Sequence, residues 1–202
     1  MSVSIIADAL KDLESYFDAL PEIATKAMVL AINDSARDSD VTLRRQMRKE
    51  VNFPAAYLRS RFGVRSKASR GALEAVIRGR DRPTSLARFV ENVGSDPVAS
   101  KGKVLRLRVA PGRTINLKRG NGDPSAFLVK LKNGNTGLAV RLKEGERISN
   151  SIGAKALGNN VYLLYGPSVD QVFRGVADDQ TPDIQRMVSQ KFFRQFTRLS
   201  RG

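Results

Sequence analysis

Apolar residues recur every three or four positions along the start of the chain. This spacing predicts an amphipathic α-helix with an apolar seam of Val3, Ile6, Leu10, Leu13, Phe17 and Leu20. Pro21 fits the first turn of a second helix, where its missing N–H costs nothing. The second helix is predicted to bury Ile23, Ala27 and Leu30 and to continue through Val41, Met47 and Val51. Its polar stretch NDSARDSD (33–40) predicts a break or an exposed middle.

The middle of the sequence changes to short segments with period-two alternation, which is typical of strands. A short helix is predicted at PAAYLRSRF (54–62) and a loop at GVRSKASRG (63–71). ALEAVIRGR (72–80) predicts a strand, and the weak-pattern stretch after DRPTSLARFVENVG, residues 95–101, predicts a loop with a short helical turn. KVLRLRVAPG (103–112) predicts a strand that buries Leu105, Leu107 and Val109, and the following RTINLKRG can pair back onto it.

The stretch AFLVKLKNGNTGLAVRLKEG (126–145) places three glycines and two asparagines between two alternating apolar runs. A loop of this composition can reverse the chain in a β-hairpin or cradle a phosphate. A phosphate cradle needs a Gly-Lys-Ser/Thr ending and a helix after the loop. Here a second alternating run follows, so the pattern predicts a hairpin turn.

The last third of the sequence returns to a helical pattern. NVYLLYGPSVDQVF (160–173) predicts a strand that ends at Gly166–Pro167, followed by a short helix capped by Ser168. Thr181-Pro182-Asp183 offers a cap, a proline and an acid for the start of a final helix. The apolar stripe of this final helix is Ile184, Val188, Phe192, Phe196 and Leu199.

The order of helices, then strands, then helices predicts an α+β fold. We expect a mainly antiparallel β-sheet, with long N-terminal helices and a C-terminal helix packed on one face. At 202 residues the chain suits a single domain. Its expected parts are a helical part (1–52), a mainly β part with basic loops (53–166) and C-terminal helices (167–202).

The amino-acid composition limits the kinds of catalytic and metal site that the protein can form. Cys and His are both absent, which excludes disulfides, thiolate nucleophiles and the commonest zinc ligands and general base. Asp81 lies between two arginines and is expected to be salt-bridged, and the acid pairs Glu144/Glu146 and Asp178/Asp179 are expected to be surface acids. We therefore predict no catalytic site, no metal and no cofactor.

The N-terminus lacks the basic start of a signal peptide, so we expect the protein in a cytosol or in something assembled there. No apolar run approaches the about 18 residues of a membrane-spanning helix, so no membrane contact is expected.

The net charge of +15 is unevenly distributed. Residues 1–36 carry 2 Lys/Arg against 6 Asp/Glu, whereas residues 37–119 carry 21 against 7. If the predicted strands share one sheet, its outward face is a basic ladder of Arg106, Arg108, Lys130, Lys132, Arg141 and Lys143. Such a face is either solvated or in contact with phosphates or an acidic partner. Base-stacking aromatics are missing from these positions, which argues against single-stranded nucleic acid.

Three segments together are similar to a known family: LEAVIRGRDRPTSLARF (73–89), AFLVKLKNGNTGLAVRL (126–142) and LLYGPSVDQVF (163–173). They resemble the prophage minor tail protein Z family, the tail-completion proteins of lambda-like, long-tailed bacteriophages. The resemblance extends from about Leu20 to Phe196 and rests on the number and order of the motifs, none of which is a catalytic signature. No functional residue of the family is carried over.

The resemblance implies a virion structural protein at the head-proximal end of the tail, present in the host cytoplasm during assembly. Its expected partners are the tail tube, the tail terminator and the head–tail connector, with self-association into a ring that we expect to be hexameric. The polar middle of the second helix and the basic loop 63–71 are the candidate contacting edges. Because duplex DNA passes through the neck of a phage, sequence-independent binding of double-stranded DNA is the alternative. A nuclease or other enzyme is less favoured.

Overall fold

The computed structural model describes residues 3–6, 14–92, 104–117, 125–148 and 153–201. Helices and antiparallel sheets confirm the predicted α+β class. The protein forms two compact units. The first unit comprises Met1–Met47, Arg59–Arg80 and Asp170–Gly202, and the second comprises Arg48–Leu58 and Asp81–Val169. Residues 59–80 thus group with the helices of the first unit.

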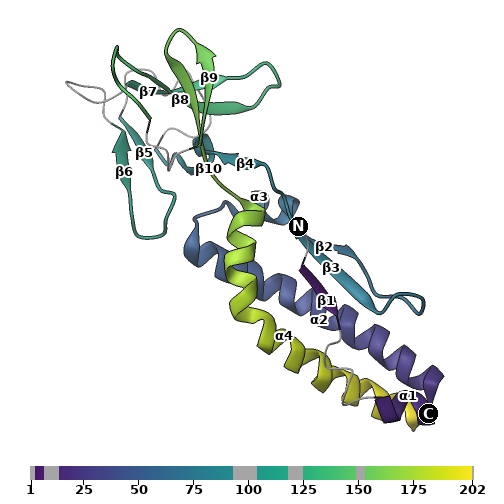
Figure 1. The fold of residues 1–202 in the computed structure, drawn as a ribbon. Coiled ribbons are helices and arrows are strands. Elements are labelled where there is room, and N and C mark those ends of the chain that lie inside the picture. Colours follow the sequence, from purple (N-terminus) through teal and green to yellow (C-terminus); the bar gives the residue numbers. More distant parts are fainter. Residues whose placement is uncertain (1–2, 7–13, 93–103, 118–124, 149–152, 202) are drawn as a thin grey trace. The chain divides into compact units, whose positions relative to one another are not determined.

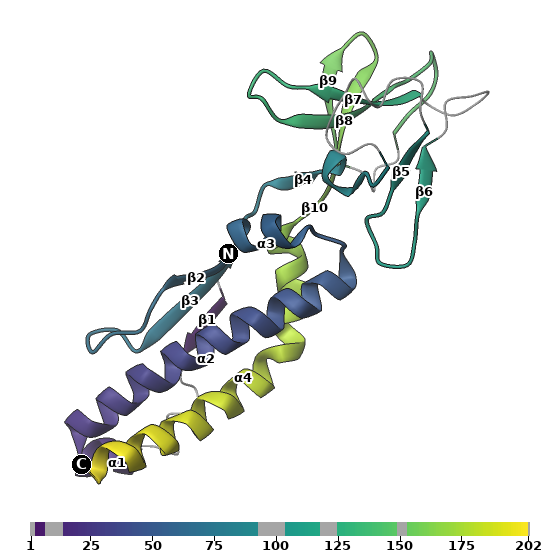
Figure 2. The ribbon, with the colours of Figure 1, turned by 180° about the vertical axis from the view of Figure 1, so that it is seen from behind.

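The first unit contains three helices and a three-stranded sheet. The helices are α1 (Glu14–Ala19), α2 (Pro21–Glu50, whose last residues belong to the second unit) and α4 (Val169–Ser200, which starts in the second unit). The sheet has the order β1-β3-β2, with β1 at Val3–Ile6, β2 at Phe62–Ser66 and β3 at Glu74–Gly79. In both views α2 and α4 run side by side in opposite directions, with the sheet along α2 (Figures 1 and 2).

The prediction of a helix from Val3 to Leu20 is wrong at its start. Val3–Ile6 is a strand that pairs antiparallel with β3, placing Val3 opposite Ile77 and Ile5 opposite Ala75. Valine and isoleucine favour extended backbone, and β3 offers an edge whose N–H and C=O groups need partners. The seam residues Leu10 and Leu13 lie outside the described residues. Helix α1 covers only the end of the predicted seam.

Helix α2 is continuous, so the predicted break at residues 33–40 is wrong. The predicted exposed middle is also wrong on one face, because Ser35, Ala36 and Ser39 are buried. Serine and alanine are small enough for close packing against a neighbouring element, so a polar sequence can still supply a buried face. Val41, predicted to be buried, is 56% exposed.

The prediction that Pro182 starts a separate final helix is also wrong, because α4 continues through it. Proline removes one backbone donor from a helix. The Thr181 hydroxyl donates to the Ala177 carbonyl at 2.9 Å, which adds a hydrogen bond in the turn preceding the proline. The predicted stripe is largely confirmed: Ile184, Val188 and Phe192 are buried, and Phe196 and Leu199 are half-buried.

Aromatic and polar contacts join the elements of this unit. Tyr16 of α1 lies edge-on to Phe192 and Phe196 of α4, with ring centroids 6.0 and 5.1 Å apart. Lys191 of α4 donates to the Asp34 carbonyl at 2.9 Å and to the Asp38 carboxylate. The first and last helices therefore pack against each other.

The predicted loop 63–71 is partly wrong, because β2 occupies Phe62–Ser66 and pairs with β3. A short helix, α3 (Ala55–Arg61), precedes it as predicted. The register shifts between Val64 and Ser66, so Arg65 sits at a bulge. Bulges and glycines weaken the alternation by which a strand is found in a sequence. Asn33 of α2 anchors the following turn through two hydrogen bonds with the Ala68 backbone, of 3.0 and 2.8 Å.

The second unit is built on a five-stranded sheet. Its order is β4-β10-β8-β7, and β9 pairs with the other edge of β10. The strands are β4 (Pro83–Ser85), β7 (Ser125–Lys130), β8 (Thr136–Arg141), β9 (Gly153–Gly158) and β10 (Val161–Ser168). A short 3-10 helix, η2 (Leu86–Phe89), follows β4 and was not predicted. The helical turn expected in 95–101 lies outside the described residues. Strand β9 was not predicted, because its sequence GAKALG contains a single large apolar residue, Leu157; all six of its residues are exposed.

The hairpin prediction is confirmed. β7 and β8 pair over their whole lengths, and the turn is closed by the Leu131 N–H donating to the Asn135 carbonyl at 2.8 Å. Gly134 has a φ of +78°, which glycine adopts without strain. A strand follows this loop, so the loop turns the chain.

The predicted strand at Leu105 is also confirmed, but in a different sheet. Within the described residues, β5 (Leu105–Leu107) forms a two-stranded sheet with β6 (Ile115–Leu117). Leu107 also forms an isolated antiparallel bridge with Val90. Leu105 and Leu107 are buried as predicted. The strands therefore do not form the one sheet that was expected.

Candidate functional site

The basic ladder expected on one sheet face is not formed. Arg106 and Arg108 belong to the β5–β6 part, separate from the sheet that holds Lys130 and Arg141. Within that sheet Lys130 pairs with Thr136, and Arg141 pairs with Ser125. Paired residues share a face and neighbours alternate, so Lys130 and Arg141 lie on opposite faces. Lys132 and Lys143 lie just beyond the strands.

Five of the six predicted partner-facing residues are exposed: Arg106, Lys130, Lys132, Arg141 and Lys143. Arg108 is half-buried and forms an ion pair with Glu91, with N and O atoms 3.3 Å apart. Its backbone is also held, because the Arg108 carbonyl accepts from the Asn52 amide at 3.3 Å. Arg108 therefore helps to hold the local structure in addition to carrying a positive charge.

A basic groove of about 530 Å³ lies in the first unit, between α2 and the α3–β2 segment. From α2 it is lined by Asn33, Asp34, Arg37, Asp40 and Arg44, which lie on one helical face. From the other side it is lined by Arg59, Phe62, Gly63, Val64, Arg65 and Lys67. The sequence had marked 33–40 and 63–71 as candidate contacting edges, and the structure brings parts of both to this one groove.

The two sides of the basic groove differ in charge balance. On α2, Arg37 pairs with Asp34 at 3.2 Å, and Arg44 pairs with Asp40. On the opposite side, Arg59, Arg65 and Lys67 are exposed and form no ion pair with any described residue. These three cations are therefore available to an external anion.

Asp40 is one of the residues that line the basic groove, and its side chain is mostly buried. Burial raises the pKa of the Asp40 carboxyl, and the charge and hydrogen bond of Arg44 oppose this increase. Gly63 covers this ion pair, since a Cβ placed there would lie 3.5 Å from an Arg44 guanidinium nitrogen and 3.6 Å from Asp40 Oδ1. The pair is thus part of the packing of β2 against α2.

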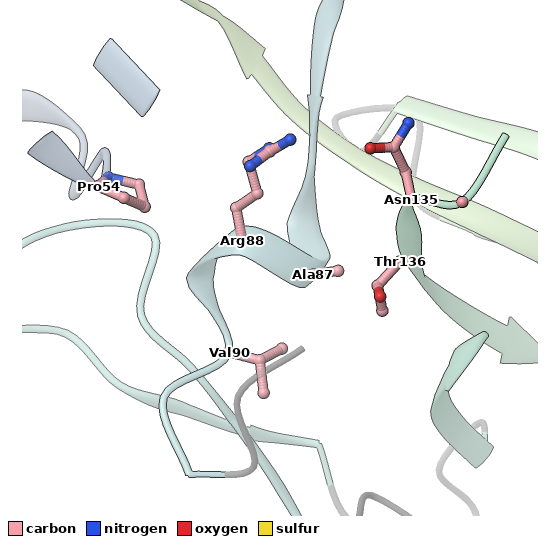
Figure 3. Close-up of a pocket in the computed structure, with 7 residues that line it drawn as sticks. Pro54, Ala87, Arg88, Val90, Asn135 and Thr136 are labelled. Carbon is pink, nitrogen blue, oxygen red and sulfur yellow. The ribbon is translucent and has the colours of Figure 1, made fainter. Parts of the chain in front are cut away.

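A second depression, the Arg88 pocket, lies in the second unit and has a volume of about 430 Å³. It is lined by Pro54, Ala87, Arg88, Val90, Gly134, Asn135 and Thr136. Figure 3 shows the Arg88 side chain rising from η2 and the Asn135 side chain rising from the β7–β8 turn, both toward the same side of the view. Sequence reasoning missed this pocket because Arg88 and Asn135 are 47 positions apart and no local pattern links them.

The Arg88 guanidinium is stacked on an aromatic ring. Its central carbon lies 4.3 Å from the centroid of the Tyr57 ring. Tyr57 is buried, and its hydroxyl lies 3.3 Å from the Thr84 hydroxyl. Arg88 forms no ion pair and no hydrogen bond with the described residues. The ring therefore orients a cation whose donors are unused.

The three segments that resemble the tail-protein family contribute most of the second unit's sheet. LEAVIRGRDRPTSLARF contains β3, β4 and η2, and AFLVKLKNGNTGLAVRL contains most of β7 and all of β8. LLYGPSVDQVF contains most of β10 and the start of α4. Since β10 lies between β4 and β8 on one edge and β9 on the other, segments far apart in sequence meet there.

The acidic residues named from the sequence do not form a cluster in the described part of the protein. Asp81 is exposed and forms no ion pair with a described residue, so its predicted salt bridge is absent. Glu146 accepts a hydrogen bond from the Lys143 N–H at 2.6 Å and so closes a turn. In the described part of the protein, no three acidic side chains come together as metal ligands would. None of the helices described there has the length and apolar character needed to span a membrane.

Comparisons with known proteins give no relative: no family model, no curated protein and no solved structure matches this sequence.

Proposed function

We propose that this protein is a bacteriophage virion structural protein, a minor tail protein that completes the tail at its head-proximal end and makes it competent to join the DNA-filled head. The observation that carries the proposal is the ordered resemblance of three segments to tail-completion proteins. The proposal is supported by the pairing of strands from all three segments in one sheet around β10. Strands that form one sheet depend on each other for folding, so their motifs are expected to occur together in one chain.

The working form that we propose is a hexameric ring on the tail. A closed ring uses head-to-tail contacts, which bring two different surfaces of each subunit together. The protein offers two surfaces of opposite sign: Asp18 and Glu22 are exposed at the start of the helices, and the basic groove presents Arg59, Arg65 and Lys67. Complementary charge orients such contacts and speeds assembly, although it does not fix affinity.

The proposal is tested in phage particles. Deleting the gene should leave filled heads and tails that do not join, and supplying the protein should restore joining. The position and copy number of the protein in intact virions give the second readout. A place inside the capsid or at the tail tip, or a single copy per particle, would contradict the proposal.

Sequence-independent binding of double-stranded DNA in the neck is the second candidate, and the excess of basic residues in 37–119 favours it. The purified protein would then shift any duplex in a gel, with an affinity that falls steeply as salt rises. Enzymatic activity is a third and weaker possibility. It would require a turnover that is lost when one acidic residue is replaced.

A further inference from the structure

The Arg88 pocket combines three properties of a binding site. It is concave, its lining includes the apolar residues Pro54, Ala87 and Val90, and its polar groups come from two separate elements. Binding pockets typically pair an apolar lining with a few fixed polar groups. Here those groups are the Arg88 guanidinium and the Asn135 amide (Figure 3).

Arg88 is prepared to bind an anion. The Tyr57 ring, 4.3 Å away, holds the guanidinium in place without using its hydrogen-bond donors. A guanidinium whose position is already fixed loses less conformational entropy on binding than a free side chain. The side-chain amide of Asn135 forms no hydrogen bond with the described residues, so it can add a further donor.

The shape and chemistry of the pocket favour a carboxylate over a phosphodiester. A planar carboxylate accepts two parallel hydrogen bonds from a guanidinium, and the Asn135 amide rises toward the same side of the pocket as Arg88 (Figure 3). A DNA phosphate brings no apolar stem, and a duplex cannot enter a depression of about 430 Å³.

We propose that the Arg88 pocket binds a carboxylate of a partner protein, with Arg88 as the bidentate donor and Asn135 as the second donor. The carboxylate belongs either to an acidic side group or to the C-terminus of the partner, and both share this chemistry. The inference rests on the geometry of the pocket, so it fails or succeeds independently of the tail-completion proposal.

The test is an NMR titration of the full-length protein, following the Arg88 Nε–H and the Asn135 side-chain amide. The probes are N-acetylglutamate amide for the carboxylate of an acidic residue and N-acetylalanine for a C-terminus, each raised to tens of millimolar. Saturable shifts of both signals with either probe support the proposal, and the more effective probe identifies the source. N-acetylglutamine amide is the neutral control and should leave both signals unchanged.

Variants separate this site from general charge attraction. R88Q should weaken binding of the effective probe by about tenfold or more, as expected for a hydrogen bond to a charged group. R88K keeps the positive charge but loses the two parallel N–H donors of the guanidinium, and it should weaken binding nearly as much. R113Q, which removes an exposed arginine elsewhere in the second unit, should have no effect. Because Arg88 is exposed and its described contact is the stacking on Tyr57, its replacement should lower the free energy of unfolding by no more than about 1 kcal/mol and leave the protein folded.

Three results would overturn the proposal. The first is no shift at Arg88 and Asn135 with either carboxylate probe. The second is a response to inorganic phosphate but not to the carboxylates, which would point to a nucleic-acid backbone instead. The third is that R113Q and R88Q weaken probe binding equally, which would mean that binding depends on the net charge of the protein.

Discussion

Asp38 and Asp40 lie two residues apart on α2 and respond to their surroundings in opposite ways. Asp40 has 14% of its side chain exposed, and burial raises its pKa despite Arg44. Asp38 has 49% of its side chain exposed, and a hydrogen bond from Lys191 lowers its pKa. For Asp40 desolvation outweighs the ion pair, whereas for Asp38 the ion pair outweighs desolvation.

We predict that Asp40 makes the protein less stable as pH rises. Its folded-state pKa is above the unfolded value of about 3.9, so the folded state holds the proton more tightly. The stabilising effect of the protonated form is present below the unfolded pKa and is lost as pH rises through the folded pKa. D40N should therefore gain stability relative to the wild type between acidic and neutral pH. Urea unfolding at a series of pH values measures this difference.

D38N is the matched comparison with the opposite sign. The lowered pKa of Asp38 means that the wild type gains stability above the unfolded pKa and loses it as pH falls through the folded pKa. D38N should lack this gain, and the effect should be small because the Asp38 side chain is half exposed and screened by solvent. If D38N and D40N gave slopes of the same sign, the assigned causes would be wrong.

At the scale of elements, glycine has two different roles in this protein. Gly137 of β8 is buried, and an added Cβ would lie 2.7 Å from Leu163 Cδ2 of the adjacent β10. Gly175 lies on the exposed side of α4, where an added Cβ would meet nothing within 4 Å. The first glycine allows close packing, and the second only weakens its helix.

We predict opposite effects of one substitution at these two sites. G137A should lower the free energy of unfolding by about 1 kcal/mol, since the end of the buried Leu163 side chain must move to make room. G175A should raise it by about 0.5–1 kcal/mol, because alanine restricts the unfolded chain and suits a helix interior. Chemical denaturation of the two variants measures both effects. Equal stability of G137A and wild type would show that β8 and β10 are less tightly packed than described.

At the scale of the whole molecule, exposed charge is distributed over several surfaces. Arg59, Arg65 and Lys67 line the basic groove, while the exposed residues of the predicted ladder lie on different strands and faces. A function that depends on partner contact should therefore depend on which surface is changed.

We predict that charge reversal separates these surfaces. R59E/R65E/K67E should preserve the fold, because all three residues are exposed, but should impair head–tail joining. R106E/K130E/K132E is the matched variant for the predicted ladder residues, and it leaves Arg108 with its Glu91 partner. The yield of joined particles is the measurement, and circular dichroism checks folding. Normal yield with both triple variants would rule out a role for either basic surface.

The sequence alone determined the features that depend on neighbouring residues along the chain. Period-two alternation around KNGNTG predicted the β7–β8 hairpin, because turn chemistry and side-chain alternation are local properties. The apolar stripe from Ile184 to Phe192 predicted the buried face of α4 for the same reason. The net charge and the absence of Cys and His follow from composition and needed no structure.

Tertiary structure alone decided which segments meet. Val3–Ile6 has a helical spacing with the residues after it, yet it is a strand because β3 offers it an edge. Thr181–Pro182 carries a helix-start signal, yet α4 continues through it. Buried residues of α4 before and after Pro182, such as Ala177 and Ile184, outweigh the one backbone hydrogen bond that proline removes. Arg88 and Asn135 meet in one pocket only through the arrangement of η2 and the hairpin around β10. Pairing across long distances depends on complementary surfaces of remote segments, and a local pattern carries no record of its partner.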